Sequence, residues 1–348
     1  MPVDLTILLF LVQDGVINGA VYALGAIALV LVFAVTRVIF VPQGEFIAFS
    51  AMTVYALENG RSPPTAVLLL VLGVLAAAAT LIRERRHLTP RVLLVTAAFN
   101  LLLPAALFAL VRWLAPMRLG PWAEVPLAIA LVVPMGPMIY RIAFEPLAQA
   151  SVLVLLIAAF GVHFSIEGLG LYFFGPEGIG TAPLAGGSFS LGSLVVTGQS
   201  LAVLGAAALL LIIFHLFFQH TLLGKGLRAC ASNRLGAGLV GIPTVLAGQI
   251  AFALAAAMAA VAGILIGPIQ TVYYDSGFLI GLKAFVAAMI GGLVSYPFAV
   301  IAALAVGIAE AFFSFWASNF KEALVFALLI PFLLIRSLGV RPHEDEPE

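Results

Sequence analysis

The chain has 348 residues, of which 63% are hydrophobic and 9% charged, and its 16 basic and 16 acidic residues leave no net charge. A soluble globular domain carries roughly 25% charged residues because its surface faces water, so this composition excludes a soluble domain. Zero net charge gives no reason to expect a nucleic-acid or polyanionic partner. The single cysteine, Cys230, excludes an intrachain disulfide framework and a cysteine-rich metal site.

Apolar stretches near the ~20 residues needed to cross a bilayer recur along most of the chain. Continuously apolar blocks such as residues 201–218 and 245–266 favour helices over the short alternating segments of a β-barrel. We therefore predict an all-α polytopic integral membrane protein with about eleven transmembrane or re-entrant helices. The expected spans are residues 5–35, 45–57, 65–82, 92–111, 123–140, 150–174, 193–218, 245–266, 278–295, 297–318 and 320–338.

The first span is expected to be retained, because Asp4 precedes it and no basic segment does. The spans at 45–57 and 278–295 are short or interrupted by glycine. Each is a candidate half-span or re-entrant element, which must be buried in protein or line a cavity.

Basic residues divide unequally between the two sets of loops, and the richer set is expected to be cytoplasmic. This orientation puts the N-terminus outside and the C-terminus and acidic tail (339–348) in the cytoplasm. The richer set holds Arg37, Arg83, Arg85, Arg86, Arg91, Arg141, Lys225, Arg228, Arg234, Arg336 and Arg341, and the poorer set Arg61, Arg112, Arg118 and Lys321.

Two loops are long enough to be more than connectors. Residues 175–191 face outside in this scheme and are rich in Gly, Pro, Ser and Thr; they predict an ordered periplasmic lid or short hairpin, with a disordered linker as the alternative. Residues 219–243 face the cytoplasm. Within them, apolar positions between Leu227 and Leu239 follow one face of a short helix, which Gly241 and Pro243 end.

A short amphipathic helix between two long spans suits docking into a groove on a soluble partner. The alternative is an interfacial helix that extends its arginines into the headgroups. Small residues (Ala229, Gly236, Ala237) would allow close approach of a partner, and Arg228 offers a guanidinium suited to a carboxylate.

The stretch GLRACASNRLGAGLVGIP resembles the cytoplasmic coupling segment of the membrane subunits of branched-chain amino acid ABC importers (the LivH/LivM type). Other stretches match that family in the same order, among them Asn18–Leu24, Gly44–Phe46 and Lys283–Phe285. The resemblance assigns ATPase coupling to Gly224, Arg228, Ala229, Asn233, Ala237, Gly241 and Ile242.

The resemblance has two departures. Pro42-Gln43 stands where the family has Ala-His, and residues 62–120 add two apolar spans joined by a basic loop. An even number of added spans keeps the topology of everything downstream, so we interpret 62–120 as an inserted helical pair within a single permease domain.

Charged and polar residues inside spans are the candidates for a transport path. Gln43 and Glu45 are the leading candidates, because broken helices aim backbone and side-chain polar groups at substrates. The alternative is that Glu45 caps its short helix and faces cytoplasmic water. Asn18 and Tyr22 share a helix face with Gly15 and Gly19, which favours packing against another helix and leaves the path as a second possibility.

Three further charged positions have simpler expected roles. Lys283 is expected to extend to the outer interface, with a substrate contact as the alternative. Glu310 is expected to pair with a polar neighbour, and Glu167 lies in or near a span. His163 and His215 have no second ligand at metal spacing, so we expect no metal site.

The sequence contains no Walker A motif and no Ser/His/Asp constellation, so we expect a transporter subunit that is not an enzyme and binds no cofactor. The resemblance implies a permease subunit of an ATP-binding cassette importer in the bacterial inner membrane. Its implied partners are a second permease, two ATPase subunits that use ATP, and a periplasmic binding protein, with branched-chain or related amino acids as substrate. A stand-alone secondary transporter or channel for a small polar solute is the alternative.

Overall fold

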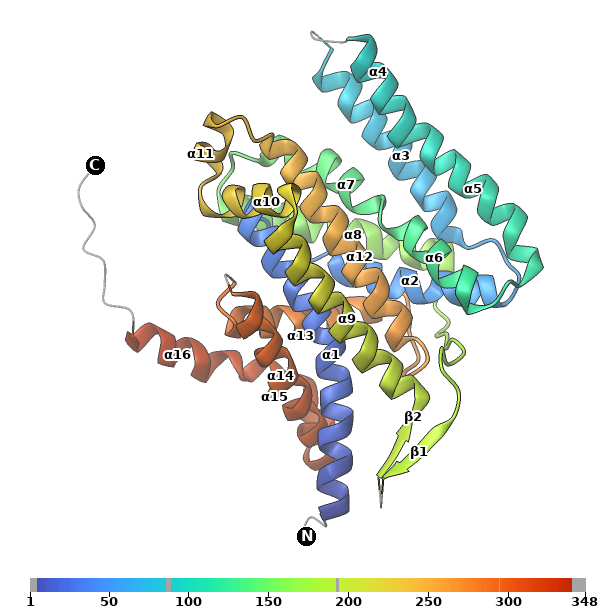
Figure 1. Ribbon diagram of the computed structural model, residues 1–348, viewed down its shortest axis with the longest axis vertical. Coiled ribbons are helices and arrows are strands. Elements are labelled where there is room, and N and C mark those ends of the chain that lie inside the picture. The colour runs from blue at the N-terminus through green and yellow to red at the C-terminus, as the bar shows by residue number, and fades with distance from the viewer. Residues whose placement is uncertain (1–4, 86–88, 192–193, 294, 340–348) are drawn as a thin grey trace.

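The computed structural model describes residues 5–85, 89–191, 194–293 and 295–339. The acidic tail predicted at 339–348 lies outside this range except for Gly339, as do Arg86 and Arg341. The molecule is an elongated helical bundle (Figure 1).

Nine stretches in the described part of the chain are long and apolar enough to cross a membrane. Six are single helices: α1 (Leu5–Thr36), α3 (Pro64–Arg83), α8 (Val152–Phe174), α9 (Gly198–His220), α12 (Thr244–Ile266) and α14 (Tyr296–Trp316). Two are runs of four short helices each: α4 (Pro90–Ala97), η1 (Ala98–Leu102), α5 (Leu103–Leu114) and η2 (Ala115–Met117); and α6 (Pro121–Val132), α7 (Met135–Ile139), η3 (Tyr140–Phe144) and η4 (Glu145–Leu147). The last is the run of η5 (Ser318–Phe320), α15 (Lys321–Ala327) and α16 (Leu329–Gly339). With the short α2 (Gln43–Glu58) and α13 (Ser276–Ile290), this arrangement confirms the predicted polytopic helical class.

Helix α1 is the centre of the bundle, and it packs most extensively along α14 and then α12. Gly15 and Gly19 permit the close approach, because a Cβ at either position would overlap the α14 backbone around Leu304 and Ile308. Small residues spaced by four bring helix backbones together in membranes, where packing replaces the hydrophobic drive. The packing role predicted for this face of α1 is therefore present.

The two short helices meet end to end inside the bundle. A Cβ on Gly44, near the start of α2, would overlap the carbonyl of Gly277 at the start of α13, and the reverse also holds. Gln43 Nε2 donates to the Gly25 carbonyl at 2.9 Å, which places the start of α2 beside the middle of α1. Residues 37–42 therefore turn back into the bundle, and both helices are short as the sequence suggested; that they are half-spans of a membrane stays a prediction.

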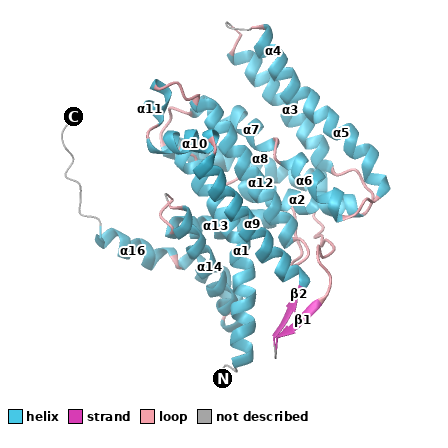
Figure 2. Cartoon of the chain, viewed as in Figure 1, coloured by secondary structure: helices cyan, strands magenta, loops and turns pink. Residues whose placement is uncertain are grey.

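The end of the bundle that carries the strands, called here the hairpin end, is covered by an ordered loop. Strands β1 (Ser188–Leu191) and β2 (Leu194–Thr197) pair antiparallel, with Ser188 opposite Thr197. Residue Ile179 bridges Val272, and Gln13 Nε2 donates to the Val195 carbonyl. The ordered loop predicted at 175–191 is present, but only β1 lies within that range and β2 lies beyond it. Figure 2 shows the two strands beside the start of α9.

Two predicted elements differ from the structure, and a third has a break within it. The span placed at 193–218 begins at Gly198, because Leu194–Thr197 form β2. The helix predicted between Leu227 and Leu239 is two helices, α10 (Leu222–Ser232) and α11 (Arg234–Leu239), separated at Asn233. The last span is divided at Leu328 into α15 and α16, and α16 turns away from the bundle axis (Figure 1).

Helices α3 and α4–α5 lie side by side as a hairpin at the edge of the molecule (Figure 1). Gly73 on α3 allows the contact, because a Cβ there would overlap the carbonyl of Asn100. This hairpin corresponds to the predicted pair at 62–120; its status as an insertion stays a prediction.

Candidate functional site

Gln43 and Glu45 stand in the first turn of α2, where the two half-helices meet. Each helix N-terminus carries a partial positive charge from its unpaired N–H groups, so the carboxyl group of Glu45 is suitably placed to offset it. Glu45 is fully buried. The alternative in which Glu45 faces water is therefore wrong, because α8 covers it.

The partner of Glu45 is a residue that sequence reasoning set aside. His163 Nδ1 lies 2.6 Å from Glu45 Oε1, and the other ring nitrogen lies 3.7 Å from Glu167 Oε2. The ring of Phe278, on α13, stacks on His163 with centroids 4.4 Å apart. The second Glu45 oxygen has no hydrogen-bond partner among the described residues. In the sequence, the one signal that could have pointed to His163 is its i, i+4 spacing from Glu167.

Gln43 borders a cavity of about 260 Å³ enclosed by α1, α8 and α13. The amide oxygen of Gln43 has no hydrogen-bond partner among the described residues, although the side chain is buried. The rest of the wall is apolar and consists of Leu29, Ile39, Phe40, Val41, Leu156, Phe160, Phe278, Gly281, Leu282 and Phe285. This cavity can enclose an apolar group and offer it one hydrogen-bond acceptor.

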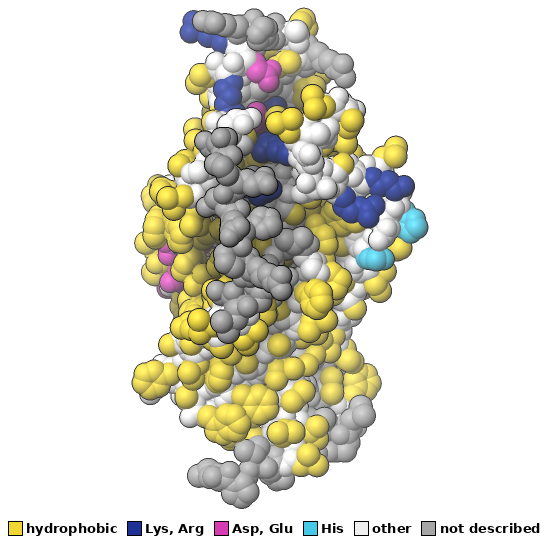
Figure 3. Space-filling view, turned by 90° about the vertical axis from the view of Figure 1, so that its left-hand side faces the viewer, with side chains coloured by type: hydrophobic (Ala, Val, Ile, Leu, Met, Phe, Trp, Pro, Cys, Tyr) yellow, Lys and Arg dark blue, Asp and Glu magenta, His cyan; other side chains and the backbone are white. Residues whose placement is uncertain are grey.

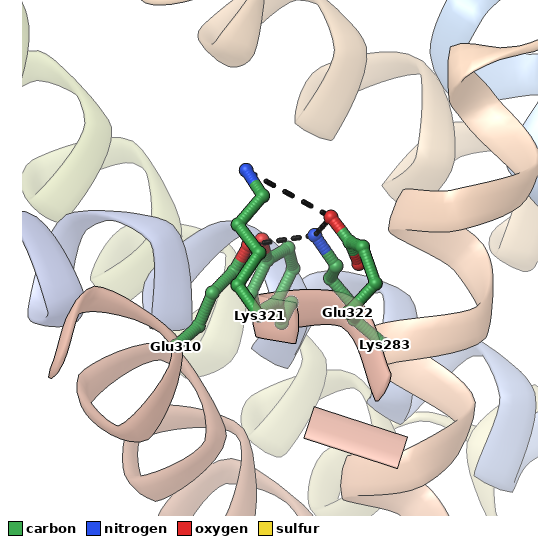
Figure 4. A network of polar contacts seen from close by, with 5 residues as sticks. Lys283, Glu310, Lys321 and Glu322 are labelled. Carbon is green, nitrogen blue, oxygen red and sulfur yellow. Dashed lines mark hydrogen bonds and ion pairs between the residues drawn. The ribbon is translucent and has the colours of Figure 1, made fainter. Parts of the chain in front are cut away.

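Tyr22 takes part in a buried charge network with Glu310 and Lys283. Figure 4 shows Lys283, Glu310, Lys321 and Glu322 of this network. The Tyr22 hydroxyl donates to Glu310 Oε2 at 2.6 Å, while Lys283 Nζ donates to Glu310 Oε1 at 2.6 Å. Lys283 also reaches Glu322 Oε1 at 3.1 Å. The expected pairing of Glu310 is therefore present. The expectation that Lys283 extends to an interface is wrong, because the residue is buried and the two carboxylates hold it inside.

Asn18 borders a different cavity of about 640 Å³ at the hairpin end. Its wall joins α1, the loop before β1, the start of α9 and the turn after α12, and includes Asp14, Gln199 and Ser200. Asp14 was absent from the predicted site residues, although it lies one turn from Asn18. Asn18 and Tyr22, predicted together, thus belong to different surroundings.

Local sequence fixes the two-helix segment α10–α11. Thr221 caps α10 by accepting from the Gly224 N–H at 2.9 Å, and Asn233 caps α11 by accepting from the Gly236 N–H at 2.8 Å. Gly224 lies directly against the Phe217 carbonyl, where a side chain would not fit. Gly241, at φ +87°, ends α11, and the Ile242 N–H bonds back to the Ala237 carbonyl. Three of the predicted coupling positions, Gly224, Asn233 and Gly241, therefore have a structural reason for their residue type.

The exposed face of this segment differs from the predicted one. Ala237 is buried within the chain and Ala229 is half-buried, so the small residues pack inward and are not free to receive a partner. Arg228 is exposed at the rim of a cavity of about 390 Å³ that it shares with His215 and Tyr296. The apolar side chains that project outward are Leu222, Leu235, Leu239 and Val240, each more than three-quarters exposed.

Cys230 lies on the inner face of α10. Burial raises the pKa of the Cys230 thiol, an effect that the nearby Arg234 guanidinium partly opposes. The thiol is therefore protonated at neutral pH and has the low reactivity of a buried structural cysteine.

Basic side chains gather at the end of the molecule opposite the β-hairpin, which we call the basic end. Arg83 and Arg141 both approach Glu145, and Arg234 donates to the Ala148 carbonyl. Figure 3 shows Lys and Arg toward one end of one face, with hydrophobic side chains over its middle. Three loops of the predicted arginine-rich set, those carrying Arg83, Arg141 and Arg234, thus lie at the same end of the molecule. No group of three His, Cys, Asp or Glu suited to a metal occurs within the described ranges.

The family model described as "Branched-chain amino acid transport system / permease component" matches residues 100–333. The chain belongs to this permease family. The high-affinity branched-chain amino acid transport system permease protein LivH of Escherichia coli (strain K12) is 33% identical over 228 residues, which cover 63% of this chain and 74% of LivH. LivH of Salmonella typhimurium matches to the same extent.

The corresponding permease protein BraD of Pseudomonas aeruginosa is 28% identical over 348 residues, covering 96% of each chain. No solved structure matches the chain significantly. The family contains transport permease components and not enzymes, which confirms the resemblance seen in the sequence and the expectation of a multi-pass membrane transporter.

Proposed function

We propose that this chain is the membrane-spanning permease subunit of an ATP-binding cassette importer for branched-chain or related amino acids. Its partners are a second permease, identical or homologous, two ATPase subunits and a periplasmic binding protein. The chain binds no cofactor of its own, and ATP is used by the ATPases. The basic end faces the cytoplasm of a bacterial inner membrane, with the N-terminus outside and the C-terminus inside.

The observation that carries this proposal is the exposed apolar face of α10–α11 at the basic end. Leu235, Leu239 and Val240 project from a segment that Asn233 and Gly241 fix in place. Apolar side chains surrounded by charge at a membrane-distal surface favour a protein partner. An ATPase groove that encloses these leucines would transmit its closure to α9 and α12, which the segment joins.

Two cavities support a substrate path from the hairpin end inward. The cavity beside Asn18 opens at the hairpin end and is lined partly by polar groups, and the cavity beside Gln43 lies at the junction of the half-helices. Discontinuous helices place binding sites near the bilayer midplane in many transporters. We assign Gln43 to direct substrate contact, Asn18 to the outer entrance, and Glu45 and Tyr22 to the buried networks that hold the half-helices beside the path.

Transport then proceeds by alternating access. ATPase closure favours one packing of α9 and α12 against the half-helices and so shifts the population between states open to either side. A ligand moves this equilibrium only as far as its affinity differs between the two states. Substrate and ATP must therefore both change the same equilibrium, which is the packing of α9 and α12 against the half-helices.

A stand-alone secondary transporter is favoured by one observation, the buried titratable pair Glu45–His163 with the half-exposed Glu167 beside it. Groups of this kind carry protons in pumps and transporters. The two candidates differ in their need for an ATPase, so one experiment separates them.

The test is to replace Leu235 and Leu239 together by Ser and to measure ATPase co-purification and substrate-stimulated ATP hydrolysis in proteoliposomes. We expect at least a tenfold loss of both, since buried leucines each contribute about 1.5–3 kcal/mol at a contact. Phe189→Ser is the matched control, because Phe189 is an exposed apolar residue at the hairpin end. Full ATPase binding and stimulation by the double variant would refute the docking surface. Substrate uptake without any ATPase would favour the secondary transporter.

A further inference from the structure

A groove of about 390 Å³ separates the α4–α5 arm from the rest of the bundle. One wall comes from the arm, a second from α7 and η3, and the third from the first half of α12. Most lining side chains are apolar, and the polar exceptions are Asn100, Arg141 and Gln249. None of these three belongs to the substrate path or the ATPase contact proposed above.

Two π-helical turns present the groove with its main polar groups. Residues Ala98–Leu102 form η1 and carry Asn100, and Tyr140–Phe144 form η3 and carry Arg141. A π-turn adds a residue to an α-helix and re-aims the side chains on it, and such turns are frequent at functional sites. Two of them facing one groove indicate a built site.

Asn100 supplies the observation that points to a ligand. The residue is 5% exposed, and its Nδ2 donor has no acceptor among the described residues. An unpaired buried donor destabilises a fold because it loses its water without gaining a partner. A ligand that brings an acceptor into the groove removes this penalty.

Arg141 adds a positive charge at the mouth of the groove. Its Nε lies 3.8 Å from Glu145 Oε2, and Arg83 Nη1 lies 3.4 Å from Glu145 Oε1. Two guanidinium groups therefore share one carboxylate, which leaves one positive charge uncompensated within this cluster. The groove offers donors and a cation, so it selects an anionic ligand with acceptors and disfavours amines.

We infer that this groove binds an anionic phospholipid. The phosphate lies at Arg141, an ester carbonyl accepts from Asn100 Nδ2, and the acyl chains follow the apolar wall past Phe99 and Ile250. Phe99 and Val95 are exposed at the rim, so a lipid can enter sideways from the bilayer. Anionic lipids bind basic pockets between transmembrane helices on the cytoplasmic side. The bound lipid joins the α4–α5 arm to α12 across the groove.

The test uses the full-length chain in its assembled complex, reconstituted in nanodiscs of phosphatidylcholine with increasing dioleoylphosphatidylglycerol. Bound lipid is counted by native mass spectrometry, and thermal stability is followed in parallel. The variants are Arg141→Gln, Asn100→Leu and Ala253→Trp, the last of which fills the groove without changing charge. We expect Arg141→Gln to weaken phosphatidylglycerol retention roughly ten- to a hundredfold, as for loss of a hydrogen bond to a charged group, and Asn100→Leu roughly two- to tenfold, as for loss of a neutral hydrogen bond. Ala253→Trp should abolish retention, because the indole occupies the space of the acyl chains.

Arg85→Gln is the control, because Arg85 is an exposed basic residue at the same end and does not line the groove. It should retain the lipid fully. Inorganic phosphate alone should give no stabilisation, since it lacks the acyl chains that fill the groove. Equal retention of phosphatidylcholine and phosphatidylglycerol, or full retention by Ala253→Trp and Arg141→Gln, would overturn the assignment.

Discussion

Lys283 and Glu45, both buried in this bundle, have charged or titratable partners on other helices. Lys283 lies between Glu310 and Glu322, and Glu45 lies against His163. Charges in a low-dielectric interior persist when they are paired, because an isolated ion there loses its hydration without compensation. The polar residues are visible in the sequence. Their partners are not, since Glu45 and His163 are 118 positions apart.

The Lys283–Glu310 pair allows a direct test at the residue scale. Lys283→Met should destabilise the protein by about 3–5 kcal/mol, because it leaves the Glu310 carboxylate buried without its ammonium partner. Adding Glu310→Gln should recover part of this loss. Thermal unfolding in detergent measures both. Lys321→Met is the control and should change stability by about 1 kcal/mol or less, since Lys321 belongs to a partly exposed and longer pair, 3.8 Å from Glu322. Equal effects of the two lysine variants would contradict this account.

At the scale of elements, the half-helices α2 and α13 decide where a path can lie. Their N-termini touch through Gly44 and Gly277, and the shortness of α13 was evident from its glycines. That the two ends meet was not evident, because no local pattern encodes a contact between residues so distant in sequence.

Gly44→Ala tests this junction. A Cβ at Gly44 overlaps the Gly277 carbonyl, so the two helices must separate, at a cost of about 1–3 kcal/mol by analogy with overpacked cores. We expect normal membrane insertion with a strong loss of uptake in proteoliposomes. Gly161→Ala on α8 is the control, since a Cβ there meets open space. Unchanged uptake by Gly44→Ala would mean that the junction tolerates separation.

At the scale of the whole molecule, charge asymmetry and helix order together predict the membrane topology. Basic loops that are distant in sequence converge at one end, where Arg83, Arg141 and Glu145 contact one another. The β-hairpin closes the opposite end. The proposed orientation then follows from the excess of arginine at the basic end.

Cysteine labelling tests the orientation directly. In a Cys230→Ser background, Arg85→Cys should react with a membrane-impermeant maleimide only from the cytoplasm, and Ser188→Cys only from outside. Both positions are exposed and lie at opposite ends of the bundle. Labelling of both from the same side would reject the span order, and labelling of each from the wrong side would reverse the orientation.

The sequence by itself determined the class, the helix order, the interrupted spans and the family. Hydropathy over a span, glycine and proline breaks and caps such as Asn233 are local properties, and lipid forces each span to satisfy its own backbone. The resemblance also assigned ATPase coupling to positions between Gly224 and Ile242, and this role stays a prediction.

Tertiary structure alone decided which side chains meet. It turned Ala237 inward and the leucines of α11 outward, paired Lys283 with Glu310, covered Glu45 with His163, and left Asn100 facing a groove. The physical reason is that an all-apolar helix carries no hydrophobic face in its sequence, since lipid and protein neighbours are equally apolar. Which face of such a helix is buried, and against what, is fixed by packing between distant segments.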